Sequence, residues 1–501
     1  MSEFPHHGSH AHDDAAGTDL DLQNDRSRWI ALLVCCSALF MTLLDVSITN
    51  VALPSISDST GAGPSQLQWI VSGYTLSFGL VPVLAGRLGD DHGRRLMFQV
   101  GVAGFAVTSA ISGLAPTAEL LIVARVFQGI SGGLINPQVS GLIQQMFRGE
   151  ERGRAFGALG TTVGLGTALG PLAGGALIAL GGPDLGWRLV FFINIPIGIA
   201  VILLGRRYLP QTPATGSHRL DVIGSLTLGA ATFCVLFAAV QFELFGPPVV
   251  WLAVPAALLL FLFWRRERRL TRDDLDPLVD LRLFRRQSYT SGVVLALLYF
   301  PAMAGLPLVL ALYFQRGLGF SALHSALGVT AFAVGSAVSA QLSGRFVTRL
   351  GRPLIVAGTT TFGAGAIAMA LVARTAPDEH AVLALAGPLF VMGLGSGAVI
   401  SPNQALTLAD VDPVVGSTAG GVLQTAQRVG LAIGQAVIGA AFFAAVSGTG
   451  PEAYGHALGT AVIVALGFVF AATSVGVWEI YRARSEVRRS RGRDRPEVPP
   501  S

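Results

Sequence analysis

Lysine is absent from this 501-residue sequence, so all 34 positively charged side chains are arginines. A Walker-type phosphate-binding loop requires a Gly-Lys-Ser/Thr ending, and a retinal pump requires a lysine for its Schiff base. Both kinds of protein are therefore excluded. No segment between the apolar stretches is long enough to form a nucleotide-binding domain, so any work that the protein performs must be driven by a gradient or by a partner.

Cysteine is also scarce. Cys35, Cys36 and Cys234 all lie within apolar stretches, which gives neither a disulfide framework nor a thiolate metal site. The histidines of the N-terminal tail are interpreted as part of a solvated segment rather than as metal ligands. No His/Cys/Ser arrangement indicates an enzyme. We therefore predict no metal, no cofactor and no catalytic site.

The hydrophobic content indicates a membrane protein. Hydrophobic residues make up 51% of the chain, charged residues 13%, and the mean hydropathy is +0.59, outside the range of soluble globular proteins. A helix needs about 20 residues to cross the hydrocarbon core. Fourteen apolar runs are long enough, and they begin near Trp29, Trp69, Met97, Glu119, Ala155, Val190, Val222, Val250, Ser291, Ala322, Leu354, Val382, Gly420 and Thr460. We predict an all-α polytopic membrane protein.

The arginines indicate which loops face the cytoplasm. Of the 34, 29 lie in alternate gaps between the apolar runs or in the two tails, and cytoplasmic loops carry such an excess. Both termini are therefore predicted to be cytoplasmic. The gap Leu406–Ser417 carries only Asp410 and Asp412, so it is assigned to the same side by parity alone. Residues 1–28 are predicted to be a disordered tail, and Trp29–Pro54 a retained helix rather than a cleaved signal.

An internal repeat divides the chain. GRLGDDHGRR (Gly86–Arg95) and GRFVTRLGRP (Gly344–Pro353) each follow the second helix of a six-helix set. The sequence predicts one six-helix half in residues 29–205 and another in 289–481, with two inserted helices and a basic loop in 206–288 and a basic tail in 482–501. Such halves rock about a central site in secondary transporters.

A carboxylate lies within the first helix, in the motif LDVSITNVALP (Leu44–Pro54). A charge at a helix centre costs about 2.5 to 3.5 kcal/mol on insertion scales, so Asp45 must be protonated, paired or exposed to a wet cavity. Desolvation favours the neutral form of a carboxyl group and a nearby cation favours the ionised form. Alternating exposure can therefore load and release a proton. A carboxylate that only locks two helices together is the structural alternative.

A cation lies at a similar depth in the fourth helix, in LLIVARVFQGISGG (Leu120–Gly133). Arg125 is about 9 Å below the outer end of its helix and Asp45 about 13 Å below Pro54 at the outer end of the first. We therefore expect them to pair. Gln128, one turn further on, is expected to line the same cavity. A snorkelling arginine with a purely structural role is the alternative.

Two further motifs involve glycine. In GLGTALGPLAGGAL (Gly164–Leu177), Gly166, Gly170 and Gly174 form a smooth stripe that allows close helix packing, and Pro171 and Gly175 complete the pattern. In the turn GRLGDDHGRR, between Gly86 and Gly93, Asp90 can accept hydrogen bonds at the start of a neighbouring helix. Arg94 can pair with acidic groups when that side closes. The turn is interpreted as a gate.

These four motifs, with WRLVFFINIPIG (Trp187–Gly198) and DVIGS (Asp221–Ser225), resemble the major facilitator superfamily, specifically its fourteen-helix drug:proton antiporter branch of the EmrB/QacA type. The resemblance extends from Trp29 to Tyr481. It implies a major facilitator fold, a proton-coupling role for Asp45, assistance from Arg125, and export on account of the glycine motif. The sequence departs from the family pattern at Asp91, where an arginine is usual, and at Thr348, where the second copy lacks an acid.

The resemblance implies proton-coupled efflux of amphipathic, drug-like small molecules from a bacterial cell, through a multi-pass protein of the inner (plasma) membrane that works as a monomer. The expected partners are the substrate, protons and lipid, and not nucleic acid. Gln128, Gln424 and Arg428 are candidates for the substrate cavity. Arg428 either selects anionic or phenolic ligands or stabilises its helix. A proton-coupled importer with the same fold is the alternative.

Overall fold

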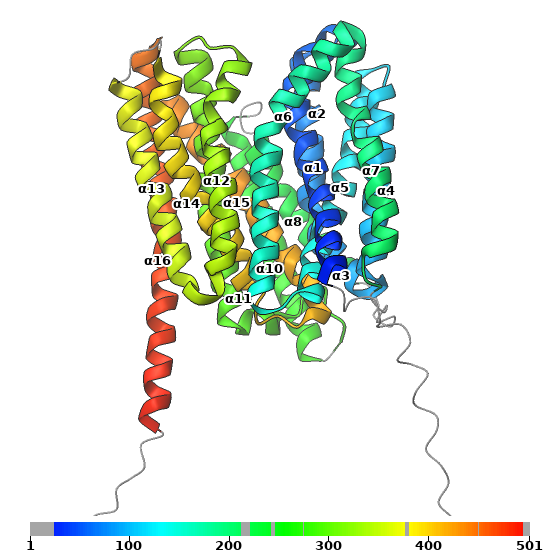
Figure 1. Ribbon diagram of the computed structural model, residues 1–501, viewed down its shortest axis with the longest axis vertical. Coiled ribbons are helices and arrows are strands. Elements are labelled where there is room, and N and C mark those ends of the chain that lie inside the picture. The colour runs from blue at the N-terminus through cyan, green and yellow to red at the C-terminus, as the bar shows by residue number, and fades with distance from the viewer. Residues whose placement is uncertain are drawn as a thin grey trace, which may run out of the picture.

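The computed structural model describes residues 25–211, 221–241, 246–273, 275–375, 380–448 and 450–493, and these residues contain helices and no strand. Figure 1 shows two bundles of long helices lying side by side. The α-helices are α1 (Asp25–Thr60), α2 (Pro64–Leu80), α3 (Pro82–His92), α4 (Arg94–Leu114), α5 (Ala118–Met146), α6 (Gly149–Phe192), α7 (Asn194–Tyr208), α8 (Val222–Val240), α10 (Ala253–Arg272), α11 (Gln287–Leu312), α12 (Ala322–Leu350), α13 (Arg352–Thr375), α14 (Ala381–Thr407), α15 (Gly416–Ala445) and α16 (Pro451–Arg493). The short helices are η1 (Pro247–Leu252), η2 (Leu281–Arg285), η3 (Tyr313–Gly317) and η5 (Pro413–Val415).

The described residues contain 13 single helices that are long and apolar enough to cross a membrane, and the bent pair of α2 with α3 makes a fourteenth candidate span when counted as one. The pair bends by 48°, at the point where Pro82 removes a backbone donor. Helix α6 contains one whole span and the start of the next, and these are separated at Gly182, whose φ of 69° is non-helical. The fourteen spans expected from the apolar runs are confirmed.

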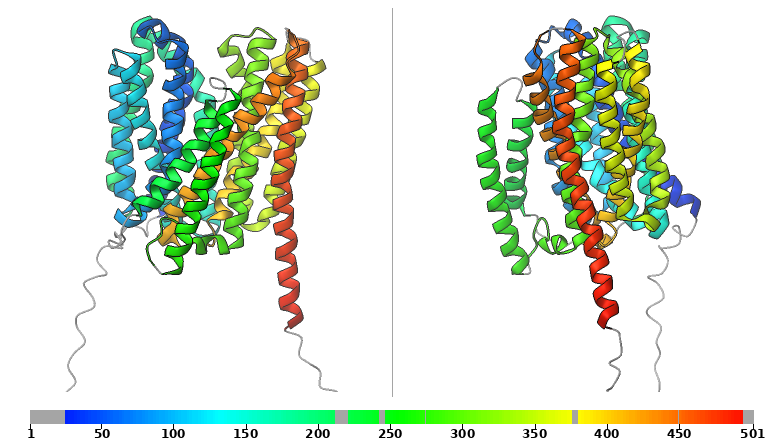
Figure 2. Two further views of the ribbon diagram at one scale, coloured as in Figure 1. Left: turned by 180° about the vertical axis from the view of Figure 1, so that it is seen from behind. Right: turned by 90° about the vertical axis from the view of Figure 1, so that its left-hand side faces the viewer.

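The two halves meet along two faces. On one face α6 of the N-terminal half packs on α12, and on another α3 and α5 pack on α15. Helix α8 lies against α2 and α15, and α10 packs on α8 at the outside of the molecule, as the right-hand view of Figure 2 shows. The inserted pair therefore covers a boundary between the halves.

Each repeated turn has a glycine with positive φ between its two helices. Gly93, with φ of 100°, joins α3 to α4, and Gly351, with φ of 58°, joins α12 to α13. Only glycine adopts positive φ without strain. The expectation of a loop over Gly86–Arg95 is wrong, because one such glycine suffices to reverse the chain and the residues before it stay helical.

Other boundaries also shift. Helix α1 begins at Asp25 and continues through Pro54 to Thr60, so its predicted outer end at Pro54 is wrong. Proline forfeits only its own amide bond, and the adjacent turns maintain the helix. Helix α16 extends past Tyr481 to Arg493, since no proline interrupts the chain before Pro496. Of the two predicted tails, residues 1–24 and 494–501 lie outside the described residues.

The segment assigned by parity lies with the arginine-rich loops. Arg286 donates to the carbonyl oxygen of Asp410 at 2.5 Å, and Arg152 donates to that of Ala409 at 3.2 Å. Helix α1 begins and α16 ends at this same end of the molecule (Figure 1), called the arginine-rich end below.

Candidate functional site

Asp45 and Arg125 form an ion pair inside the N-terminal half. Asp45 Oδ2 of α1 lies 2.5 Å from Arg125 Nη1 of α5. The side chains are 0% and 1% exposed respectively, so neither charge is solvated by bulk water. A buried charge requires a partner of opposite sign and further hydrogen bonds.

Two amides complete the coordination of the carboxylate. Gln128 Nε2 and Asn194 Nδ2 each donate to Asp45 Oδ1 at 2.9 Å, and Gln128 Oε1 accepts from Arg125 Nη1 at 2.9 Å. Asn194, at the start of α7, also donates to Ser109 Oγ at 2.9 Å. The Asp45 network therefore draws its members from four spans. Sequence reasoning missed Asn194, although its amide is conspicuous in the quoted motif WRLVFFINIPIG.

Aromatic rings enclose the cation. The Arg125 guanidinium carbon lies 4.2 Å from the ring centroid of Tyr74, on α2, and Arg125 Nε donates to the carbonyl oxygen of Ile70 at 3.3 Å. Cation–π contact with a desolvated arginine is worth about 2 kcal/mol. Tyr74 thereby links the ion pair to the second span.

The glycine stripe on α6 positions the helix that carries Asp45. A Cβ atom at Gly166 would lie 2.9 Å from Leu43 Cβ, and one at Gly170 would lie 2.1 Å from Ser47 Cβ. Gly174 faces Ile48 in the same way, at 3.3 Å. Gly175 faces open space, so it takes no part in this packing. Helix α6 continues through Pro171 without interruption.

Asp90 connects the two halves at the arginine-rich end. Its carboxylate accepts hydrogen bonds from the backbone amides of Ser417 (3.2 Å) and Thr418 (2.8 Å) and from Thr418 Oγ1 (2.8 Å). These donors belong to the first turn of α15, where the helix dipole favours a negative charge. An acid of the N-terminal half thus caps a helix of the C-terminal half.

Arg94 reinforces the same contact. It pairs with Asp90 at 2.8 Å and donates to the carbonyl oxygens of Pro413 and, at 3.1 Å, Val414. A Cβ atom at Gly86 would lie 2.4 Å from the carbonyl oxygen of Ser417, so only glycine permits this approach. The arginine-rich end is closed in this conformation.

The departures from the family pattern have local partners. Asp91, where an arginine is usual, pairs with Arg87 one turn earlier at 3.2 Å. In the second copy Arg352 occupies the position of Arg94 but bonds within its own half, to Glu479 of α16 at 2.9 Å. Thr348, at the position of Asp90, is exposed. Only the first copy forms a buried polar contact across the halves, whereas the second contributes an exposed ion pair of Arg349 with Glu150 of α6 at 3.4 Å.

A central cavity of about 310 Å³ lies between α1, α2, α8 and α15. Tyr74, Phe78, Leu236 and Arg428 are among the residues that line it. The Arg428 guanidinium lies 4.2 Å from the centroid of the Phe78 ring. Tyr74 therefore borders both the Asp45 network and this cavity.

Two of the three candidates for the substrate cavity lie elsewhere. Gln128 belongs to the Asp45 network, and Gln424 donates to Ser140 Oγ at 3.3 Å, below the cavity on the side of the arginine-rich end. Neither lines the central cavity as far as the described residues define it. An amide that can satisfy a buried carboxylate or hydroxyl is held there by the gain in hydrogen bonding. Arg428 does line the cavity.

The family model described as the Major Facilitator Superfamily matches residues 35–435. The chain belongs to this superfamily. The resemblance inferred from its motifs is confirmed.

Named relatives of this major facilitator protein cover most of its length. A probable actinorhodin transporter of Streptomyces coelicolor is 39% identical over 420 residues, which are 83% of this chain and 72% of that one. The tetracenomycin C resistance and export protein of Streptomyces glaucescens is 32% identical over 438 residues, covering 86% and 78%. The solved structure of the human organic anion transporter MFSD10 has a TM-score of 0.63 at 16% identity, covering 88% and 99%. At that identity the likeness shows the fold alone.

This major facilitator protein is a transporter and not an enzyme, and its relatives place it in a bacterial plasma membrane as a multi-pass protein. Its fold, with fourteen candidate spans and solved neighbours of the same superfamily, agrees with the predicted fold class.

Proposed function

We propose that the protein exports amphipathic, drug-like small molecules in exchange for protons, by alternating access and as a monomer. The observation that carries the proposal is the buried pair of Asp45 and Arg125, which Tyr74 connects to the central cavity between the halves. A titratable carboxylate at a substrate cavity allows proton binding and substrate binding to influence each other.

The proton step is assigned to Asp45. In the conformation described here its carboxylate accepts hydrogen bonds from Arg125, Gln128 and Asn194. When the halves rock, Arg125 would withdraw from the carboxylate and a proton would take its place. Proton and substrate would then occupy the protein in alternation.

The direction of transport is supported by the gate and by the relatives. If the arginine-rich end is cytoplasmic, as its charge predicts, the Asp90 and Arg94 contacts close the protein on the cytoplasmic side. The conformation is then one that releases substrate outward. The relatives named for antibiotic transport, resistance and export support efflux of an antibiotic or of several drugs.

The test is gradient-driven transport into inverted membrane vesicles. An acidic interior should drive accumulation of a substrate dye and substrate should release protons, and Asp45→Asn should abolish both at matched expression. Asp58→Asn, on the exposed outer end of the same helix, serves as the control. Transport that survives Asp45→Asn would overturn the coupling, and accumulation by intact energised cells would favour the importer.

A further inference from the structure

The charges that line the two cavities proposed as the transport pathway are all positive. Arg428 is the charged side chain among the described residues that line the central cavity. A second cavity of about 880 Å³ adjoins it, shares Val240 and Gln435 with it, and has Arg316 as its charged lining residue in the same part of the chain. No described carboxylate lines either cavity. The pathway therefore attracts anions.

Arg428 is available to a ligand. Within the described residues it forms no ion pair, and its observed partner is the face of Phe78. The rings of Phe78 and Tyr74 are 5.7 Å apart, so the cation borders an aromatic surface from α2. A planar aromatic group can stack on such a surface while an acidic substituent meets the guanidinium.

Unsatisfied hydroxyl groups lie beside the cation. The hydroxyl oxygens of Ser72 and Tyr74 are buried and have no hydrogen-bond partner in the described structure, and both residues line the central cavity. A buried hydroxyl without a partner carries a free-energy penalty of about 1 to 3 kcal/mol. An oxygen-rich anion would supply an acceptor for Ser72, whereas the Tyr74 hydroxyl lies toward Gly132 of α5. The cavity volume, about 310 Å³, suits a system of two or three fused rings.

We infer, on the basis of the proposed efflux function, that the substrate is an aromatic anion, such as a carboxylate or an acidic phenol, whose charge binds Arg428 and whose ring stacks on Phe78 and Tyr74. The cation lies on the C-terminal half and the aromatic face on the N-terminal half. Such a substrate therefore bridges the two halves.

The experiment compares three fluorescent naphthalene probes of similar size: 1-hydroxy-2-naphthoate, its neutral amide, and 1-naphthylmethylammonium. Binding to the purified protein is measured in the absence of any gradient. We expect the anion to bind at least tenfold more tightly than the amide, and Arg428→Gln to remove that preference while leaving amide binding unchanged. Arg428→Lys should retain part of the preference, and Arg374→Gln, at the outer end of α13, should retain it all. Thermal melting of each variant checks folding.

The outcomes separate this inference from the proposed function. Equal binding of the three probes, failure of the anion to bind, or a preference that survives Arg428→Gln would overturn the inference. In vesicles, gradient-driven and Asp45-dependent transport of the amide or ammonium but not of the naphthoate would also overturn it, and would leave proton-coupled efflux intact. Transport of the naphthoate without dependence on a gradient would instead contradict the proposed coupling.

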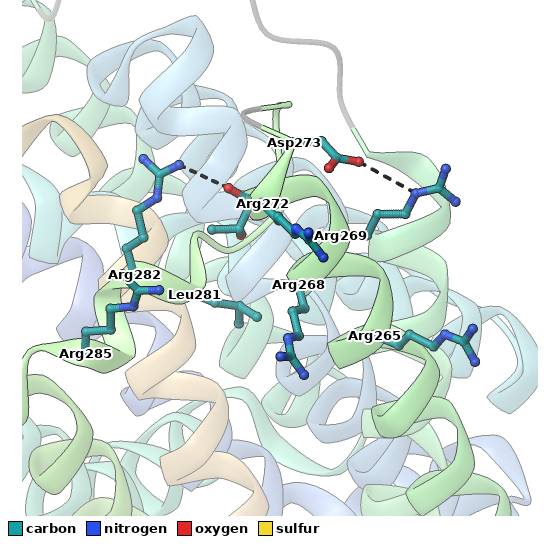
Figure 3. A pocket seen from close by; sticks show the side chains of 9 residues that line it. Arg265, Arg268, Arg269, Arg272, Asp273, Leu281, Arg282 and Arg285 are labelled. Atoms are coloured by element: carbon teal, nitrogen blue, oxygen red, sulfur yellow. Dashed lines mark hydrogen bonds and ion pairs between the residues drawn. The ribbon is translucent and has the colours of Figure 1, made fainter.

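An independent observation concerns a cleft at the arginine-rich end. It has a volume of about 780 Å³, and Figure 3 shows the arginines of α10 and η2 around it. These are Arg265, Arg268, Arg269, Arg272, Arg282 and Arg285. Arg269 pairs with Asp273 at 3.8 Å and Arg282 with Asp280 at 3.9 Å. The other four have no carboxylate partner within the described residues.

The cleft lies where a lipid headgroup is expected. The preceding turns of α10 expose Leu258, Phe261 and Trp264 on the outer surface. Tryptophan gathers at membrane interfaces, and Arg265 follows Trp264 directly. Clustered arginines at that depth match the phosphate of an anionic lipid, to which guanidinium groups bind bidentately. We propose that this cleft binds the phosphodiester of an anionic phospholipid.

The test uses native mass spectrometry of the full-length protein in phosphatidylglycerol and in phosphatidylcholine. We expect retained phosphatidylglycerol, and at least tenfold less of it in the double variant Arg268→Gln with Arg272→Gln. The variant Arg345→Gln with Arg482→Gln, which loses the same charge elsewhere, should retain it. Equal retention in both double variants would overturn the proposal. So would inorganic phosphate that displaces the lipid at millimolar concentration, because the site would then recognise a free anion.

Discussion

The turns at Gly93 and Gly351 both place a glycine with positive φ between two helices, but their side chains have different partners. In the N-terminal half Asp90 and Arg94 bond to the start of α15 across the boundary between the halves. In the C-terminal half Thr348 is exposed and Arg352 bonds to Glu479 within its own half. The repeated fold supplies two similar halves. The contacts of Asp90 and Arg94 with the start of α15, called the latch below, come from the side chains of the N-terminal half alone.

The interiors of the two halves also differ, and the N-terminal half again holds more of the buried polar contacts. The N-terminal half holds an ion pair and two amides around Asp45. The core of the C-terminal half is built from aliphatic and aromatic side chains such as Leu306 and Phe362, and its intramembrane cation, Arg428, faces the central cavity. One half thus holds the carboxylate proposed to carry the proton, and the other the cation proposed to bind the substrate. The following predictions test this division.

The largest effect is expected from Arg125→Gln. This change leaves the Asp45 carboxylate buried with amides alone, and removing one member of a buried pair costs about 3 to 5 kcal/mol. We expect loss of gradient-driven efflux and a clear fall in the melting temperature. Arg374→Gln, on the exposed outer end of α13, should change neither quantity.

The double variant Asp45→Asn with Arg125→Gln makes the comparison sharper. It removes both charges together, so we expect its melting temperature to return most of the way to that of the unmodified protein. Gradient-driven efflux should still be lost. A double variant that melts as low as Arg125→Gln would show that the fall does not come from an isolated carboxylate.

The next effect concerns the latch. Asp90→Asn weakens charge-assisted hydrogen bonds worth about 1.5 to 3 kcal/mol each, so the arginine-rich end should open. We expect at least tenfold faster maleimide labelling of Ser140→Cys, which is buried beside Gln404 and Gln424, from that end and in a background without the native cysteines.

The matching change in the other half is Thr348→Asp. It should not create a second latch, because the start of α6 already carries Glu150 and Glu151, and these occupy the positive end of the helix. Labelling of Ser140→Cys should therefore not slow. Slower labelling would mean that the two turns are chemically equivalent after all.

A smaller, symmetrical effect is expected from the glycines of the repeat. Cβ atoms at Gly86 and Gly344 would lie 2.4 Å and 2.5 Å from the carbonyl oxygens of Ser417 and Gly153 respectively. Overpacking of this kind costs about 1 to 3 kcal/mol. Gly86→Ala and Gly344→Ala should therefore lower efflux to a similar, several-fold extent. Gly387→Ala, which meets nothing within 4 Å, is the control, and unequal effects of the first two would break the symmetry.

The smallest effect on transport is expected from Glu479→Gln. Its partner Arg352 belongs to the same half, so the change should lower the melting temperature and leave the initial rate of efflux within about twofold, as for a structural pair. A loss of efflux as large as that of Asp90→Asn would place this pair in the gate.

The sequence was sufficient to predict features that depend on position along the chain. Apolar length predicted the fourteen spans, and equal depth in two helices predicted that Asp45 would meet Arg125, which lies 2.5 Å away. The capacity of Asp90 to accept from a neighbouring helix also followed from its place in the turn, although the identity of that helix did not.

Features that depend on the angle of a side chain around its helix could not be predicted. Asn194 and Tyr74 join the Asp45 network because α7 and α2 turn those residues inward, and Gln128 bonds to Asp45 instead of lining the cavity. The sequence also could not predict that Leu236 of α8 lines the central cavity, because nothing in an apolar run indicates what it packs against.

Helix α15 carries both the backbone amides that Asp90 caps and the guanidinium of Arg428, 11 residues and about 16 Å apart along one uninterrupted rod. Two sites on one rigid element are thermodynamically linked, and such linkage is reciprocal. Any ligand that draws Arg428 toward the N-terminal half must change the affinity of the latch, and any agent that opens the latch must change the affinity for the ligand by the same factor. Occupancy of the cavity would then change the contacts at the start of the same helix.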